Sequence, residues 1–206
     1  IGLPKVETPE QLSTIDWLIT QLERDQGLDA GMIDLIPIIE TGKGLAAVEN
    51  IAHAPHRVRR LSFGAGDFSL DMNIRWTMEE HELDYARAKI ATASRAARLE
   101  SPLDTVFIHL GMLEGLRSSS ERARNFGFQG KLCIHPEQIE PVNQVFSPSP
   151  EEIKQAQKYV DAFKAAEASG SASIQVEGYF IDYPIVEKAQ RTLDVAKAIE
   201  QSRRRV

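Results

Sequence analysis

Apolar residues in the first part of the chain form short continuous runs that alternate with stretches of helical periodicity. Short apolar runs bounded by turn residues are typical of strands buried on both faces of a parallel sheet. The runs lie near Leu3 and at IDLIPII (33–39), LSFG (61–64), DTVFIHL (104–110) and KLCIH (131–135). Alternation of strand and helix, without paired neighbouring strands, predicts an α/β fold whose parallel sheet is wrapped by helices.

The helical stretches carry N-terminal signals. Thr8 and Gln11 fit a capping box, in which the two side chains accept hydrogen bonds from backbone amides of the first turn. Thr77 and Glu80 fit a second capping box, ahead of an expected helix over 83–97. Further helices are expected over 45–54, 114–126 and 135–146.

The number of strand–helix units suggests part of a barrel. A TIM-type (β/α)8 barrel has eight units in about 250 residues, whereas residues 1–146 supply five. We therefore expect residues 1–146 to be the five C-terminal βα units of a TIM-like barrel, with roughly three units in front of the sequence given. An open five-stranded sheet is the competing interpretation.

The pattern changes after residue 146. Residues 147–206 predict a helix capped by Ser149 and Glu152, a hairpin over 174–182 and a last helix over 185–199. A helix, a small hairpin and a helix do not continue a barrel. We expect residues 147–206 to form a C-terminal arm that packs on or into a neighbouring subunit.

Two acids follow neighbouring predicted strands. Glu40 ends the first long run, and Asp67 follows the next run through a Gly-Ala-Gly turn that contains Gly66. Carboxyl ends of parallel strands share one edge of a sheet, where ligands bind in α/β folds. Either acid alone would more readily be a helix cap or a solvated loop residue. As a pair they suit Mg²⁺, which takes one or two carboxylates together with water and substrate oxygens.

Composition narrows the function classes. The chain has 206 residues, 42% of them hydrophobic, and a net charge of −6 with mixed signs, which argues against a nucleic-acid partner. A single cysteine, Cys133, permits no internal disulfide and fits a reducing cytoplasm. No apolar run approaches the roughly 18 residues of a membrane span. We expect a cytoplasmic protein without a membrane partner.

The remaining motifs do not identify a nucleotide, phosphate or zinc site. Gly64-Ala65-Gly66 lacks the third glycine of a dinucleotide fingerprint, and Gly42-Lys43-Gly44 lacks the spacing of a phosphate loop. The five histidines are scattered, which argues against zinc. Asp182, at the end of the hairpin, has the spacing of a cap for the helix that follows it.

Several segments together resemble the citrate lyase β-subunit-like family of Mg²⁺-dependent acyl-CoA lyases and aldolases. The matching segments, in the family's order, are LPKVET, IPIIETGKG, FGAGDFSLDM, ELDYARAKI, GFQGKLCIHPEQI, VNQVFSPSPEEI and GYFIDYP. The resemblance implies a TIM-like barrel and assembly as a homotrimer or hexamer. Two departures are Met112, where similar proteins carry Asp, and Asn73, where they often carry Gly.

The resemblance also implies roles for individual residues. Glu40 and Asp67 fall on the family's metal-binding acids. Asp182 falls on its catalytic acid, which the arm delivers into the site of the adjacent subunit. Glu40, Gly66 and Ile181 are the expected substrate contacts.

The implied function is cleavage of a carbon–carbon bond. The expected substrate is a β-hydroxyacyl-CoA of the citramalyl-, malyl- or citryl-CoA type, and the expected products are an acyl-CoA and a 2-oxo acid. Two alternatives remain open at this point: a thioesterase acting on a malyl-CoA type of substrate, and a non-catalytic protein that binds CoA thioesters.

Overall fold

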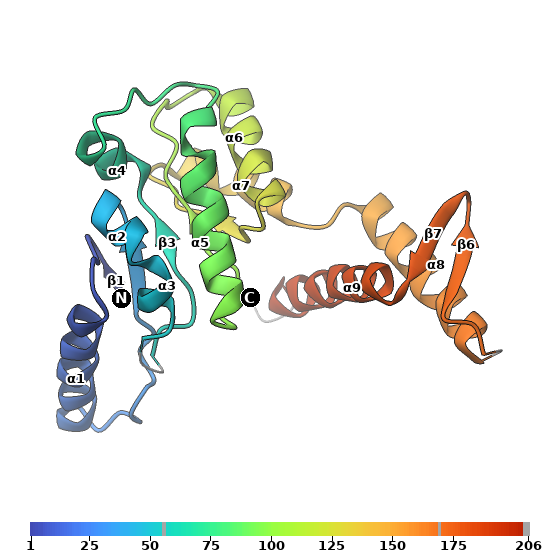
Figure 1. Cartoon of the computed structure of the whole chain (residues 1–206), viewed down its shortest axis with the longest axis horizontal. Helices are drawn as coiled ribbons and strands as arrows, with labels where there is room; N and C mark the ends of the chain where they lie inside the picture. The colour runs from blue at the N-terminus through green and yellow to red at the C-terminus, as the bar shows by residue number, and fades with distance from the viewer. Residues whose placement is uncertain (55–56, 169, 204–206) are drawn as a thin grey trace. The chain divides into compact units, whose positions relative to one another are not determined.

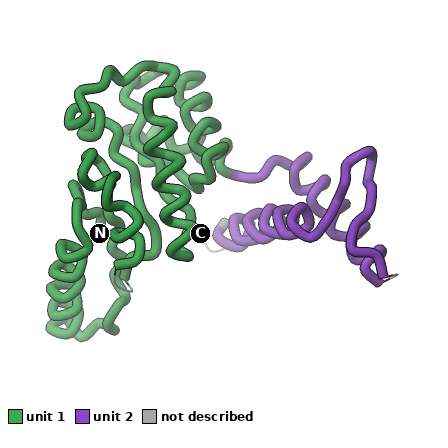
Figure 2. The backbone as a smooth tube through the Cα atoms, viewed as in Figure 1, with its two compact units in different colours: residues 1–146 green, residues 147–206 purple. Residues whose placement is uncertain are grey.

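The computed structural model describes residues 1–54, 57–168 and 170–203. The chain divides into two compact units, residues 1–146 and 147–206, which Figure 2 draws in green and purple. Among the described residues, every helix is too short or too polar to cross a membrane.

The first unit contains a parallel sheet whose strands are ordered as they occur in the sequence. Figure 1 labels β1 and β3 of this sheet. Its strands are β1 (Gly2–Leu3), β2 (Ile36–Ile39), β3 (Ser62–Phe63), β4 (Leu103–Asp104) and β5 (Gly130–Lys131). Ile39 of β2 pairs with Phe63 of β3, so these two strands end side by side. An α/β fold with a parallel sheet was predicted and is confirmed.

Helices connect consecutive strands of the first unit, and further helical segments follow its last strand, β5. They are α1 (Pro9–Asp25), α2 (Gly42–Ala46), α3 (Val48–Ala52), α4 (Ala65–Asp71), α5 (Asp84–Ala96), α6 (Leu113–Asn125) and α7 (Ile139–Phe146), with short 3-10 helices η1 (His81–Leu83) and η2 (Pro136–Gln138). Helix α3 contacts both α1 and α5, and α6 contacts α7. The core between sheet and helices includes Leu12, Ile39, Ile51, Phe63 and Ile90, all fully buried.

Two strands are shorter than their apolar runs suggested. β4 ends at Asp104 and β5 at Lys131, although strands were expected over 104–110 and 131–135. Beyond these points, the side chain of Gln138 makes backbone hydrogen bonds that a neighbouring strand would otherwise make. Its Oε1 accepts from the Ile134 amide at 2.9 Å, and its Nε2 donates to the Phe107 carbonyl at 2.8 Å. A side chain that satisfies backbone groups in this way makes further strand pairing unnecessary.

One of the two expected capping boxes in the first unit is present. Thr8 and Gln11 form theirs at the start of α1. The box expected from Thr77 and Glu80 is wrong, because the Thr77 amide and hydroxyl donate to Glu82, at 2.5 and 2.9 Å. Glu80 has a φ of +55°, and this left-handed conformation turns its side chain into the interior of the unit. The residue is 2% exposed.

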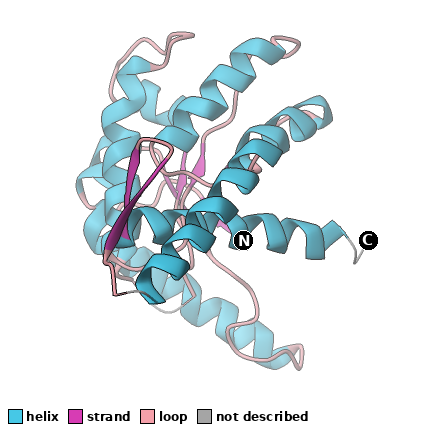
Figure 3. Cartoon of the chain, turned by 90° about the vertical axis from the view of Figure 1, so that its right-hand side faces the viewer, coloured by secondary structure: helices cyan, strands magenta, loops and turns pink. Residues whose placement is uncertain are grey.

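The second unit consists of α8 (Pro150–Ala168), strands β6 (Ser173–Val176) and β7 (Tyr179–Asp182), and α9 (Tyr183–Arg203). Ser149 and Glu152 form the expected capping box, with bonds of 2.7 and 3.1 Å. The hairpin turns at Glu177 and Gly178, whose φ angles are +51° and +86°. Figure 3 shows β6 and β7 as adjacent magenta arrows joined by this turn.

Candidate active site at the ends of β2 and β3

Glu40 follows the last residue of β2 and is held by its surroundings. The Lys5 backbone amide donates to its Oε1 at 2.8 Å. Gly64, opposite it on the β3 side, leaves the space that its Oε2 occupies, because a Cβ at position 64 would lie 2.4 Å from that atom. The residue is 7% exposed. Glu40 is therefore a buried carboxylate with a fixed orientation.

Asp67 belongs to the first turn of α4, two residues after Ala65 begins that helix. Its Oδ1 lies 3.0 Å from the Nζ of Lys5, and its side chain is 42% exposed. The sequence suggested a loop position past the strand, whereas the helix starts directly after Gly64. An acid in the first turn is also favoured by the helix dipole.

Lys5 is the residue that contacts both acids. It has a φ of +48°, a left-handed conformation that is uncommon for residues other than glycine. Its amide reaches Glu40 and its ammonium reaches Asp67. The ion pair with Asp67 raises the pKa of the Lys5 ammonium. Sequence reasoning missed Lys5, although it lies within the matching segment LPKVET.

Electrostatics at the site favour a cation. Burial raises the pKa of the Glu40 carboxyl, and the negative charge of Asp67 raises it further, against the opposing effect of the Lys5 amide. Two neighbouring carboxylates thus face one ammonium. Within the described part of the chain, no group of three or more His, Cys, Asp and Glu side chains is arranged to hold a metal. The two carboxylates fit Mg²⁺, which accepts two such ligands and completes its coordination with water and substrate oxygens.

Neighbouring loops are joined by side-chain hydrogen bonds beside the acids. Thr41 caps α2 by accepting from the Gly44 amide at 3.0 Å, and its hydroxyl donates to Glu7 at 3.0 Å. The Gly42 amide donates to Asp71 at 2.7 Å. These bonds connect the segments after β1, β2 and β3, so the segment that carries each acid is supported by a neighbour.

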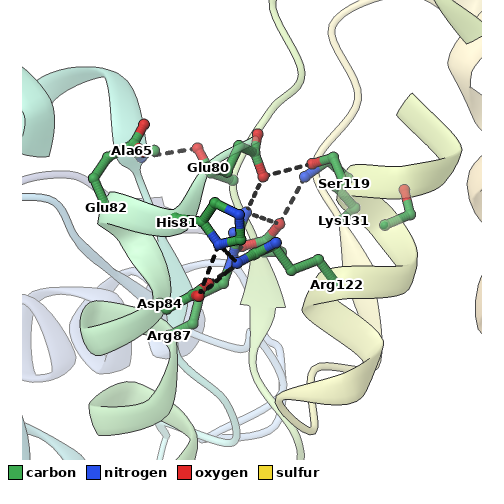
Figure 4. A network of polar contacts seen from close by, with 12 residues as sticks. Ala65, Glu80, His81, Glu82, Asp84, Arg87, Ser119, Arg122 and Lys131 are labelled. Atoms are coloured by element: carbon green, nitrogen blue, oxygen red, sulfur yellow. Dashed lines mark hydrogen bonds and ion pairs between the residues drawn. The ribbon is translucent and has the colours of Figure 1, made fainter. Parts of the chain in front are cut away.

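A buried ion-pair network lies between the sheet and the helices (Figure 4). Arg87 of α5 donates to both carboxylate oxygens of Asp104 at 3.0 Å and to Glu80 at 2.6 Å. Lys131 of β5 donates to Asp104 at 2.6 Å, and Ser119 donates to Glu80 at 2.8 Å. Burial acts to raise the pKa of Asp104, but the charges of Lys131 and Arg87 outweigh it and lower that pKa.

Sequence reasoning missed this network, although a signal was present. Arg87 lies four residues after Leu83 and three before Ile90, and so falls on the apolar face of its helix. A charged residue on such a face needs a buried partner. Asp104, at the start of an apolar run, is that partner.

The expected site residues fall in both units. Glu40, Gly66 and Asp67 come together in the first unit, where Gly66 is exposed. Ile181 and Asp182 belong to the second, where Ile181 is 1% exposed. The Oδ1 of Asp182 accepts from the Ile185 amide at 3.4 Å, the capping contact that its spacing suggested.

The two departures noted in the sequence have structural consequences. Asn73 has a φ of +52°, a conformation that glycine adopts freely and asparagine tolerates better than most residues. Met112 is the N-cap of α6, where no side-chain hydrogen bond is made to the helix. An Asp at this position could accept such a bond, so its replacement by Met leaves the first turn of α6 without that support.

Comparison with known proteins finds relatives across nearly the whole chain. The profile of the HpcH/HpaI aldolase/citrate lyase family matches residues 1–136. The citrate lyase subunit beta of Leuconostoc mesenteroides subsp. cremoris is 36% identical over 198 residues, covering 96% of this chain and 65% of that protein. The mitochondrial citramalyl-CoA lyase of Homo sapiens is 33% identical over 210 residues, covering 97% and 60%. The chain thus spans less than two thirds of the length of these relatives.

Solved structures show the same fold. A citrate lyase from Burkholderia xenovorans superposes with a TM-score of 0.83 at 26% identity, covering 97% of this chain and 64% of that one. The protein CitE of Mycobacterium tuberculosis, solved with magnesium, acetoacetate and coenzyme A, gives a TM-score of 0.72 at 25% identity, with 95% and 67% covered. The chain belongs to the HpcH/HpaI aldolase/citrate lyase family.

Proposed function

We propose that the protein is a Mg²⁺-dependent carbon–carbon lyase. It cleaves a β-hydroxyacyl-CoA of the citramalyl-, malyl- or citryl-CoA type into an acyl-CoA and a 2-oxo acid. The observation that carries this proposal is the pair of acids at the ends of β2 and β3, Glu40 and Asp67, both in contact with Lys5. Relatives named citrate lyase subunit beta and citramalyl-CoA lyase support the substrate class.

The proposed assembly follows from the same family. The five parallel strands, in sequence order, are part of a TIM-type barrel, since an ordered parallel sheet with short crossover helices is how such barrels are built. The arm of residues 147–206 packs on a neighbouring subunit in a homotrimer or hexamer. The single cysteine, Cys133, is consistent with a cytoplasmic location.

Glu40 and Asp67 hold the metal in this proposal. When bound, Mg²⁺ supplies a Lewis acid that polarises the oxygens of the acid half of the substrate. Glu40 presents an oxygen already oriented by the Lys5 amide and the space at Gly64. Gly66 is exposed beside Asp67, so its backbone is open to the substrate.

Asp182 acts as the general acid. Breaking the carbon–carbon bond leaves an electron pair on the α-carbon of the acyl-CoA, while the former hydroxyl carbon becomes the carbonyl of the 2-oxo acid and its hydroxyl proton passes to solvent. Asp182 gives its proton to that α-carbon, and in the condensation direction it removes the same proton. Ile181, buried next to it, fixes the end of β7 and with it the direction of the acid.

Product identification tests the proposal. A panel of citramalyl-, malyl- and citryl-CoA is incubated with the protein with and without Mg²⁺, and Glu40→Gln serves as the control. We expect metal-dependent formation of an acyl-CoA and a 2-oxo acid. Free CoA would instead identify a thioesterase, and binding without turnover would identify a non-catalytic binding protein.

A further inference from the structure

A buried hydrogen bond connects Thr105, which directly follows β4, to α4, the helix that carries Asp67. The Ala65 amide donates to the Oγ1 of Thr105 at 2.8 Å, and Thr105 is 1% exposed. Ala65 is the first residue of α4, and its N-cap is Gly64, which has no side chain to offer. Thr105, the residue that follows β4, therefore performs the capping function for α4.

The position of Thr105 is itself fixed by the residue before it. Asp104 is fully buried and receives hydrogen bonds from Arg87 and Lys131. Arg87 is bonded in turn to Glu80, which also accepts from Ser119. The network thus joins β4 to β5, α5 and α6, and the residue next to Asp104 meets α4. Figure 4 shows Ala65 at one side of this group of contacts.

We propose that Thr105, held in place by the buried ion pairs of Asp104, is a positioning residue that fixes the carboxylate of Asp67 for metal binding. Asp67 is two residues after Ala65 in the same first turn, so its backbone follows the placement of the Ala65 amide. Without the Thr105 hydroxyl, the amide has lost its partner and the turn can shift. The inference rests on the proposed function, because it assigns Asp67 to the metal site.

The test compares three variants by their Mg²⁺ affinity, measured by isothermal titration calorimetry. Thr105→Val keeps the shape of the side chain and removes the acceptor, and Thr105→Ser keeps the hydroxyl. Ser62→Ala is the matched control: Ser62 is 1% exposed, and its hydroxyl donates to the Leu103 carbonyl at 3.3 Å, a bond between β3 and β4 that does not involve α4.

We expect Thr105→Val to weaken Mg²⁺ binding by about tenfold or more, since loss of a residue that orients a metal ligand typically costs about 10- to 100-fold in metal affinity. Thr105→Ser and Ser62→Ala should stay within about twofold of the unchanged protein, because neither alters the bond to Ala65. Mg²⁺ affinity unchanged in Thr105→Val, or lowered equally in Ser62→Ala, would overturn the proposal. If Thr105 acts only by stabilising the fold, Ser62→Ala, which also removes the hydrogen bond of a buried side chain, should weaken Mg²⁺ binding to the same extent.

Hydrogen exchange supplies a measurement that does not need the Val variant to fold. In the unchanged protein the Ala65 amide should exchange slowly, as a core amide does, both with and without Mg²⁺. Exchange at the rate of an open loop would refute the bond and the proposal with it. If the unchanged protein binds no Mg²⁺ while Ala65 is protected, the metal assignment has failed, and the role of Thr105 toward the metal fails with it.

Discussion

Gly64 and Glu40 occupy complementary space: a Cβ atom on Gly64 would lie 2.4 Å from Oε2 and 2.8 Å from Cβ of Glu40. Gly64→Ala must therefore displace the buried carboxylate. We expect this variant to weaken Mg²⁺ binding by at least about tenfold, because the acid loses the surroundings that orient it. Calorimetric titration with Mg²⁺ measures the effect.

Gly2→Ala is the control for this variant. Gly2 lies in β1, the strand next to β2. A Cβ on Gly2 would lie 3.7 Å from Ile38, which is an ordinary contact. Its Mg²⁺ affinity should be unchanged. Equal affinities in Gly64→Ala and Gly2→Ala would show that the space beside Glu40 does not control the site.

Asp182→Asn distinguishes the proposed role of Asp182 as a general acid from its role as the cap of α9. Asparagine retains an Oδ1 that can accept from the Ile185 amide, so the start of α9 should remain intact. It has no proton to deliver, so we expect turnover to fall by at least about a hundredfold, the lower range of general-acid contributions. Mg²⁺ affinity should not change, since the proposed metal ligands are Glu40 and Asp67.

Mixed oligomers test whether the acid acts across subunits. Coexpression of Asp182→Asn with Glu40→Ala should restore part of the activity, because some sites then combine intact metal acids with an intact Asp182 from a neighbour. Each variant alone serves as the baseline. Hybrids that form but show no more activity than the baselines would place Asp182 in its own subunit's site or outside catalysis.

Removal of Arg87 should strongly destabilise the first unit. Arg87→Met leaves Asp104 and Glu80 buried without their shared partner, and breaking a buried ion pair from one side costs about 3–5 kcal/mol. Urea unfolding at neutral pH measures the change. Arg59→Met, which removes an exposed ion pair with Asp34, should cost about 1 kcal/mol or less. Equal costs would contradict a special role for the network.

Acid should destabilise the protein through Glu23. Hydrogen bonds from Arg57 lower the pKa of this buried carboxyl to about 2, with help from the amides of Gly31 and Ile33 against the effect of burial. A folded pKa below the unfolded value gives stability that is present above pH 4.5 and is lost as the pH falls toward 2.

The urea midpoint of the unchanged protein should therefore fall between pH 5 and pH 3, in the window where Glu23 is protonated only on unfolding. Glu23→Gln should be less stable at pH 5 and lose less between the two values. Glu49→Gln, an exposed site with the same change of charge, should follow the unchanged protein. An identical pH response in Glu23→Gln and the unchanged protein would rule out Glu23 as the source.

The elements that could be predicted were those with local signals. Apolar runs located all five strands, and the hairpin turn at Glu177 and Gly178 needed only its own residues. Strand lengths were less predictable, because the side chain of Gln138 satisfies Ile134 and Phe107 from a distant position. A run of apolar residues cannot show which backbone groups a remote side chain will occupy.

Part of the candidate site could also be predicted from the sequence. Glu40 and Asp67 could be found because each follows a strand, and strand ends are visible in the sequence. Lys5 and Thr105 could not, because their contacts join segments far apart in the chain, 35 residues for Lys5 with Glu40 and 40 for Thr105 with Ala65. Glu80 was assigned to a helix cap because spacing alone does not show that its backbone turns left-handed.

The contact between Lys5 and Glu40 determines what a mutational scan of this protein can detect. The donor is the backbone amide, so every residue except proline preserves it. An alanine scan would report only the lost ion pair with Asp67 and would rank position 5 by that exposed contact. The support given to Glu40 would go unrecorded. An ester in place of the peptide bond is needed to make it visible, because proline, whose ring holds φ near about −65°, cannot adopt the φ of +48° found at position 5.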